Sequence, residues 1–266
     1  MLSKLIKYEF KATARFFLPL FLALLVFAVI SRIIVPLGPE EFDIPAVISM
    51  VLYISIMVGM FVMTFIMMIQ RFYKNLLTEE GYLMFTLPVK PWQHIVSKLL
   101  VSMFWVAASG LAALTSILII TLREGSFTSF LREFSIFYHQ VLEYLGASVY
   151  LVSFEIILAI LVTLASGILI IYASIAIGHL FNHHKILASL GAFIALNTLS
   201  QILFLLLSQI PGMSHFANFH ITPENLLTTM PIFHLAIAFG TFFALLWSAA
   251  YFATANYILS KRLNLE

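Results

Sequence analysis

Six long stretches of this sequence are apolar on all sides and almost free of charge. Only two of them contain a charged residue, Arg32 in the first and Glu155 in the fourth. An α-helix needs about 20 apolar residues to cross roughly 30 Å of hydrocarbon, whereas the strands of a barrel are shorter and alternate in polarity. The stretches therefore predict six membrane-spanning helices, at about residues 16–37, 44–69, 99–122, 144–178, 186–210 and 231–260.

The composition excludes a soluble protein. Charged residues make up 10% of the 266 residues, whereas a soluble domain carries roughly 25%. The apolar fraction is 62%, which is more than the interior of a globule of this size can enclose. The net charge of +2 is too small to indicate nucleic-acid binding. The sequence thus predicts an all-α polytopic membrane protein without a nucleic-acid partner.

The short loops indicate which side of the membrane holds the termini. Six crossings place both termini on one side, and 11 of the 14 Lys and Arg residues lie there; the other three are Arg32, Arg123 and Arg132. Because loops rich in Lys and Arg stay in the cytoplasm, we expect both termini to be cytoplasmic. Residues 126–143, on the other side, alternate aromatic and charged residues, and they predict a short helix on the outer surface.

Residues 1–15 are predicted to form a separate amphipathic helix ahead of a six-span domain at residues 16–266. The basic residues of this segment repeat at the spacing of one helical stripe, and apolar residues cover the rest of the circumference. Such a helix lies in the membrane interface with its bases toward headgroups and water. Glu9 interrupts the apolar side, and it either reaches water or has a specific partner. The basic stripe consists of Lys4, Lys7, Lys11 and Arg15.

The sequence contains no motif for catalysis or nucleotide binding. None of the 11 glycines precedes a lysine, as a Walker A loop requires, and Gly-x-Ser-x-Gly, His-Glu-x-x-His and cysteine are absent. His179 and His183 have the spacing of metal ligands, but no carboxylate lies near them in the sequence. Glu79-Glu80 resembles the paired glutamates of CAAX-type intramembrane proteases, without the arginine that follows them there. We therefore expect no catalytic residue, metal or cofactor in this chain.

The link between the second and third spans, residues 71–98, is rich in large apolar residues. Phe72, Leu76 and Leu77 can share one face of a short helix, and Gly81 is well placed to end it. Two prolines then prevent a continuous helix into the next span. This helix either packs against its own bundle or projects as a contact for a cytoplasmic partner.

Two segments carry a family resemblance. The link contains the run NLLTEEGYLMFTLP at residues 75–88, and the chain opens with KYEFKATARFF at residues 7–17. The first run resembles a stretch of the permease subunits of bacterial ABC-2 type ATP-binding cassette exporters, and the second is similar to the N-terminal helix of the same family. Six spans and cytoplasmic termini fit this family over essentially the whole chain.

The resemblance implies a division of labour between chains. Two copies of a cytoplasmic ABC ATPase bind ATP and magnesium, and a second permease subunit, identical or related, completes the membrane part. The helix after the second span docks on the ATPase, with Leu76 and Leu77 as its apolar anchor. The cargo is amphipathic or hydrophobic, such as a peptide antimicrobial or a drug, and it crosses the bacterial cell membrane. The implied coupling residues are Arg71, Phe72, Lys74, Asn75, Leu76, Leu77, Glu79, Glu80, Gly81 and Tyr82.

Polar residues inside the spans are the candidates for a translocation route. A carboxylate near the middle of a spanning helix costs about 3 kcal/mol, so such residues usually face protein or water. In the sixth span, small and polar residues recur every seven positions from His234 to Ala255. Such stripes also serve close helix packing in lipid, so both roles stay open. The candidates are Glu155, Ser166, Asn197, Gln201, Thr241 and Ser248, with Glu155 the strongest.

Two other functions stay open at this point. An ion-coupled carrier or channel that works without an ATPase would use Glu155 as its titratable site. A membrane enzyme, such as a metalloprotease, would be built on the histidines at positions 179, 183 and 184.

Overall fold

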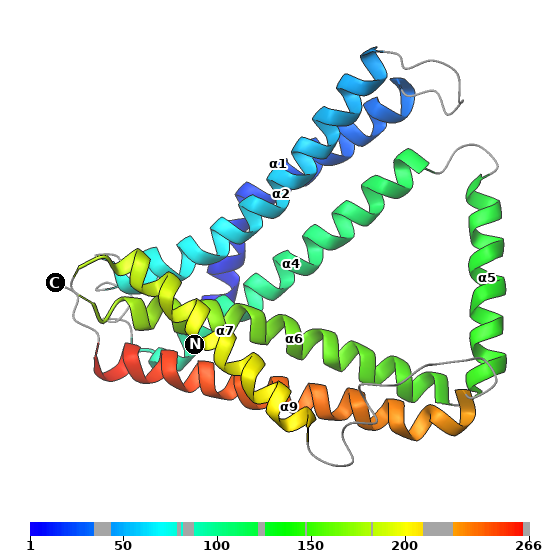
Figure 1. Ribbon diagram of the computed structural model, residues 1–266. Coiled ribbons are helices and arrows are strands. Elements are labelled where there is room, and N and C mark those ends of the chain that lie inside the picture. The colour runs from blue at the N-terminus through cyan, green and yellow to red at the C-terminus, as the bar shows by residue number, and fades with distance from the viewer. Residues whose placement is uncertain are drawn as a thin grey trace. The chain divides into compact units, whose positions relative to one another are not determined.

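The computed structural model describes residues 1–34, 44–78, 81, 88–121, 126–146, 148–181, 183–209 and 226–262. These residues form helices and turns without a strand. The helices are α1 (Leu2–Ile34), α2 (Ile44–Leu77), α4 (Pro91–Thr121), α5 (Ser126–Leu145), α6 (Ser148–Gly178), α7 (Lys185–Ser208) and α9 (Leu226–Lys261) (Figure 1). Apart from α5, each contains a segment long and apolar enough to cross a membrane. The prediction of an all-helical chain with six helices that can span a membrane is confirmed.

The chain divides into two compact units, and each contains three of the six candidate spans. The first unit comprises Met1–Leu76 and Leu83–Arg132, which includes α1, nearly all of α2, and α4. The second comprises Leu77–Tyr82 and Glu133–Glu266, which includes α6, α7 and α9. Neither unit begins or ends at residue 15, where the sequence predicts a boundary.

α1 continues without interruption through the predicted boundary, so a separate interfacial helix is not supported. One stripe of buried residues with helical spacing crosses residue 15: Thr13, Phe17, Leu24, Ala28 and Ser31. Pro19 lies inside the helix and removes only the hydrogen bond that the Arg15 carbonyl would accept. The four bases of the predicted stripe are exposed. The segment before residue 15 thus belongs to α1 because the two parts share one packing face.

Hydroxyl groups and apolar side chains hold the first unit together. The Tyr53 and Ser116 hydroxyl oxygens lie 2.8 Å apart, and those of Thr64 and Ser109 lie 2.9 Å apart, so each pair joins α2 to α4. Hydrogen bonds between small polar side chains are a common means of packing helices in lipid. The apolar cluster beside them consists of Leu24, Ala28, Tyr53, Met60 and Ala113.

In the second unit α6 packs against both α9 and α7. α6 and α9 run side by side in the same direction (Figure 1). α6 and α7 come closest where α6 ends, because a Cβ atom added at Gly178 would lie 2.5 Å from the Ser189 backbone nitrogen. Glycine is therefore required at this position for the observed approach of the two helices.

Candidate functional site

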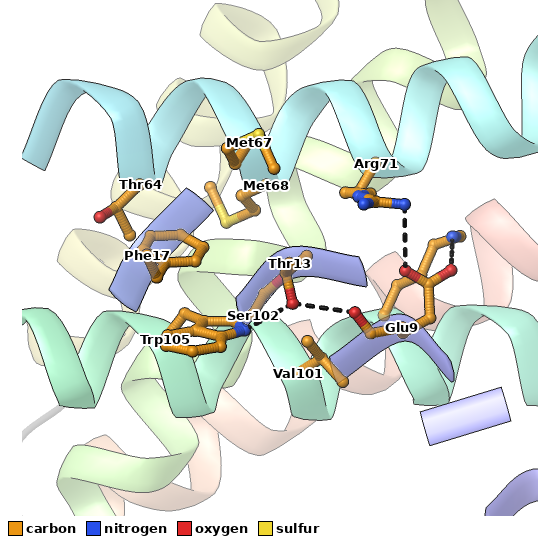
Figure 2. Close-up of a pocket in the computed structure, with 11 residues that line it drawn as sticks. Glu9, Thr13, Phe17, Thr64, Met67, Met68, Arg71, Val101, Ser102 and Trp105 are labelled. Carbon is orange, nitrogen blue, oxygen red and sulfur yellow. Dashed lines mark hydrogen bonds and ion pairs between the residues drawn. The ribbon is translucent and has the colours of Figure 1, made fainter. Parts of the chain in front are cut away.

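Glu9 lies at the centre of a polar cluster that joins three helices of the first unit (Figure 2). Its Oε1 atom accepts a hydrogen bond from Lys98 Nζ of α4, and its Oε2 atom lies 3.9 Å from Arg71 Nη1 of α2. The Lys98 side chain is 2% exposed and that of Glu9 is 11% exposed. Removing one partner of a buried ion pair is costly. Glu9 therefore ties α1 to the last turns of α2 and to the first turns of α4.

An aromatic stack and a hydroxyl bridge lie beside this cluster. Trp105 Nε1–H donates to Thr13 Oγ1 at 2.7 Å, and the Thr13 hydroxyl donates to the Glu9 carbonyl at 2.8 Å (Figure 2). The Trp105 ring stacks on Phe17 with centroids 4.4 Å apart and on Phe10 with centroids 5.0 Å apart. Stacked rings of this kind add to the gain from apolar burial. α4 thus holds the beginning of α1 by both polar and aromatic contacts.

A small pocket that is partly open to the outside lies at the cluster. Side chains from α1, α2 and α4 line it: Glu9, Thr13, Phe17, Thr64, Met67, Met68, Arg71, Lys98, Val101, Ser102 and Trp105. The ion pairs occupy its polar end (Figure 2). The sequence left open whether Glu9 reaches water or has a specific partner, and the structure supports a specific partner. The sequence did not identify Lys98 or Arg71 as that partner.

The apolar residues predicted to dock on an ATPase lie in the last turns of α2 and are buried. Phe72 and Leu76 are 0% exposed, and Leu77 is 3% exposed. Asn75 and Gly81 are buried as well. Burial of this face is what the alternative of packing within the chain predicts.

The other predicted coupling residues are divided between contact and exposure. Arg71 pairs with Glu9, and Lys74 is exposed beside Tyr73 and Gln70 on the same side of α2. Glu79, Glu80 and Tyr82 lie outside the described residues. The described part of the link therefore exposes Tyr73 and Lys74, with Gln70 just before them, and buries the leucines.

In the second unit, Glu155 of α6 pairs with His234 of α9. Glu155 Oε2 lies 2.7 Å from His234 Nδ1, and the two side chains are 22% and 25% exposed. The sequence singled out Glu155 and treated His234 only as the first residue of a seven-residue stripe. Both side chains are ionisable residues inside predicted spans, so the sequence marks each of them as unusual. That they contact each other depends on how α6 and α9 pack.

The remaining translocation candidates do not gather around Glu155. Asn197 Oδ1 accepts a hydrogen bond from Gln201 Nε2 at 3.2 Å within α7. Ser248 donates to the carbonyl of its own helix at Ala244, at 2.7 Å. Thr241 is buried and Ser166 is half-buried. The structure brings two of the six candidates together and pairs Glu155 with a residue outside the predicted set.

The histidines at 179, 183 and 184 fall in the turn between α6 and α7. Among the residues that the structure describes, no three His, Cys, Asp or Glu side chains gather as metal ligands would. This part of the chain therefore gives no support to a metalloprotease.

No protein-family model, curated protein or solved structure matches the chain.

Proposed function

We propose that this chain is the permease subunit of an ABC-2 type exporter powered by a separate cytoplasmic ATPase. The observation that supports this most is the position of the two partners of Glu9. Arg71 begins the link of residues 71–98 and Lys98 ends it, and both bind the same carboxylate. Both ends of the link are therefore held to α1. If a bound partner moves the link, α1, α2 and α4 move with it.

Transmission of this kind requires a stiff element. α2 is one helix from Ile44 to Leu77, so no break separates the spanning part from the last turns. Packed helices and ion-pair networks with discrete arrangements are the structures that carry such motions. The buried apolar face around Leu76 then holds the link in place, and the exposed side at Gln70, Tyr73 and Lys74 receives the partner.

The full assembly in this proposal contains two copies of the ATPase, which bind ATP and magnesium, and a second permease subunit. The termini face the cytoplasm of a bacterial cell, and the cargo is an amphipathic or hydrophobic molecule such as a peptide antimicrobial or a drug. The resemblance of residues 75–88 and 7–17 to ABC-2 permeases supports this assignment.

The proposal predicts that Tyr73→Glu combined with Lys74→Glu abolishes assembly with the ATPase. Both side chains are exposed, and replacing them with an acidic pair at the docking surface costs several kcal/mol of affinity. The measurement is co-purification of the chain with an ABC ATPase encoded beside its gene, together with ATP hydrolysis by the complex. We expect hydrolysis by the complex to fall at least about tenfold.

The matched control is Lys261→Glu, which reverses an exposed base at the end of α9. This variant should keep both the complex and its activity. A complex that survives the Tyr73/Lys74 change, or wild-type chain that transports in proteoliposomes without any ATPase, would contradict the proposal.

The Glu155–His234 pair favours a second candidate function, an ion-coupled carrier that works without an ATPase. Ionisable residues inside spans mark ion and proton routes in many transporters. In proteoliposomes that contain only this chain, a carrier would accumulate cargo when a pH gradient is imposed. The exporter would not do so until ATPase and ATP are added.

A further inference from the structure

The Glu155–His234 pair differs from the Glu9 cluster in one chemical respect. Glu9 is paired with an arginine and a lysine, Arg71 and Lys98, whereas Glu155 is paired with a histidine. His234 is charged only when it carries a second ring proton, and histidine is the side chain that gains or loses charge between about pH 5 and 8. The charge of the Glu155–His234 pair therefore depends on the protons it holds.

In the described parts of α6, α7 and α9, few side chains besides Glu155 and His234 can carry a charge. Buried Val152 and Val162 flank Glu155 along α6. α6 packs against α7 and α9, and in the described parts of these three helices His234 is the ionisable side chain that faces Glu155. Tyr150 is exposed. Lys185 is the first residue of α7 and Lys261 is the last residue of α9, so each lies at the helix end that is remote from the pair. The other ionisable residues of these helices are Tyr172, Tyr251 and Tyr257.

We propose that Glu155 and His234 together form a proton-binding site, and that its occupancy sets how closely the first turns of α6 and α9 approach. This inference holds for an exporter and for a carrier alike, so it does not rest on the proposed function. The two side chains are about a quarter exposed, so the pair is not sealed inside the protein.

The number of protons on the pair determines its net charge. With neutral His234, the Nδ1–H group donates to the Glu155 carboxylate and the pair carries one negative charge. A proton added to His234 Nε2 gives an ion pair of net charge zero. A further proton on the carboxylate leaves an imidazolium with a neutral carboxyl, which is a net positive charge. Because a net charge in apolar surroundings requires water, the helix beginnings are closest when the pair holds the single added proton.

The packing below the pair makes its effect local. The seven-residue spacing continues on α9 with Thr241, Ser248 and Ala255, and on α6 with Val162, Leu169 and Ala176. All of these except Ser248 are buried. Since none of these six positions carries an ionisable group, we expect only the beginning of the seam to respond to protons.

The experiment measures the distance between the two helix beginnings as a function of pH. The chain contains no cysteine, so spin labels attach only to cysteines introduced at the exposed positions Leu151 of α6 and Leu235 of α9. Double electron–electron resonance is recorded on the full chain in nanodiscs from about pH 4.5 to about pH 9. A control pair of labels replaces Leu180 and Tyr257, which lie at the opposite end of the seam.

We expect the short-distance fraction in the wild-type background to pass through a maximum, because one added proton gives a neutral pair. In His234→Gln the fraction should rise steadily as pH falls, since Glu155 alone is neutral when protonated. In Glu155→Gln it should rise steadily as pH increases, since His234 alone is neutral when deprotonated. The double variant should show no pH dependence, and the control labels should not respond in any background.

Three results would overturn the proposal. The first is a wild-type fraction that does not change with pH, and the second is the same slope in both single variants. The third is a double variant that responds as the wild type does. Circular dichroism and size-exclusion profiles identify any misfolded variant; if the double variant misfolds, the opposite slopes of the single variants decide the matter.

Discussion

Glu9 is the residue on which the contacts among the first three candidate spans converge. Its carboxylate binds Lys98 and Arg71, and its carbonyl accepts the Thr13 hydroxyl. Thr13 in turn accepts the Trp105 indole N–H. An unpaired carboxylate with this little exposure would be costly to bury, and its two cationic partners offset that cost.

At the scale of single residues, we predict that Glu9→Gln destabilises the chain by on the order of 3 kcal/mol. The change keeps the shape of the side chain but removes the negative charge opposite Lys98, whose side chain is 2% exposed. The measurement is the free energy of unfolding in mixed micelles with increasing SDS.

The matched control for this change is Lys7→Gln, which removes an exposed charge from the same helix and should alter stability by less than about 0.5 kcal/mol. Exchanging the charges with Glu9→Lys and Lys98→Glu should recover part of the loss. Equal stability of Glu9→Gln and Lys7→Gln would show that the cluster contributes nothing to the fold.

At the scale of helices, the approach of α6 and α7 depends on the missing side chain of Gly178. A Cβ atom there would meet the backbone of Ser189, which cannot move as a flexible side chain does. The turn between the helices includes His184 with a φ of 58°, a left-handed conformation that closes the chain sharply. α7 therefore begins directly against the end of α6.

We predict that Gly178→Ala destabilises the chain by about 1–3 kcal/mol, because the two helices must separate to accommodate one methyl group. The matched control is Gly167→Ala in the same helix, where nothing lies within 4 Å of the added atom. That change should be neutral or stabilise by up to about 1 kcal/mol, since alanine favours helix. Thermal unfolding of both variants in detergent tests the difference, and equal midpoints would refute the close approach.

The last turns of α2 show how one helix end can serve two purposes. Its apolar side, with Phe72 and Leu76, is buried, and its polar side, with Tyr73 and Lys74, is exposed. The pattern in the sequence identified the apolar side and left its role open, and the family resemblance assigned it to a partner. A side chain that is buried within the chain cannot also anchor an external partner without a rearrangement, so the docking test belongs on the exposed side.

At the scale of the whole molecule, the two units each supply three candidate spans. An even number of spans puts both termini on one side of the membrane, and the distribution of Lys and Arg favours the cytoplasm. α5 follows the third candidate span, so we expect it on the opposite side.

This topology predicts the labelling of single cysteines introduced into the cysteine-free chain. In intact cells, a membrane-impermeant maleimide should label Thr128→Cys in α5 and leave Ser3→Cys and Arg262→Cys unlabelled. After the cells are permeabilised, all three should react, which confirms that each site is accessible. Labelling of either terminus in intact cells would reverse the orientation or change the number of crossings.

The spans could be predicted because their signal is carried by each segment alone. Residues 44–69, for example, contain no charge and can satisfy their backbone groups in lipid only as a helix. The separate helix that the sequence predicts before residue 15 is not supported, because that prediction relied on the basic stripe of one side. The buried stripe of the other side, from Thr13 to Ser31, shows that the helix continues.

What the sequence by itself determined is the number of candidate spans, their helical nature and the scarcity of charge inside them, because these follow from the cost of placing polar groups in hydrocarbon. What only the tertiary structure decided is which charges meet. Glu9 and Lys98 are 89 residues apart in the sequence, and Glu155 and His234 are 79 residues apart. Partnership over such separations is set by which helices pack together and in what register, and composition and periodicity along one segment do not contain that information.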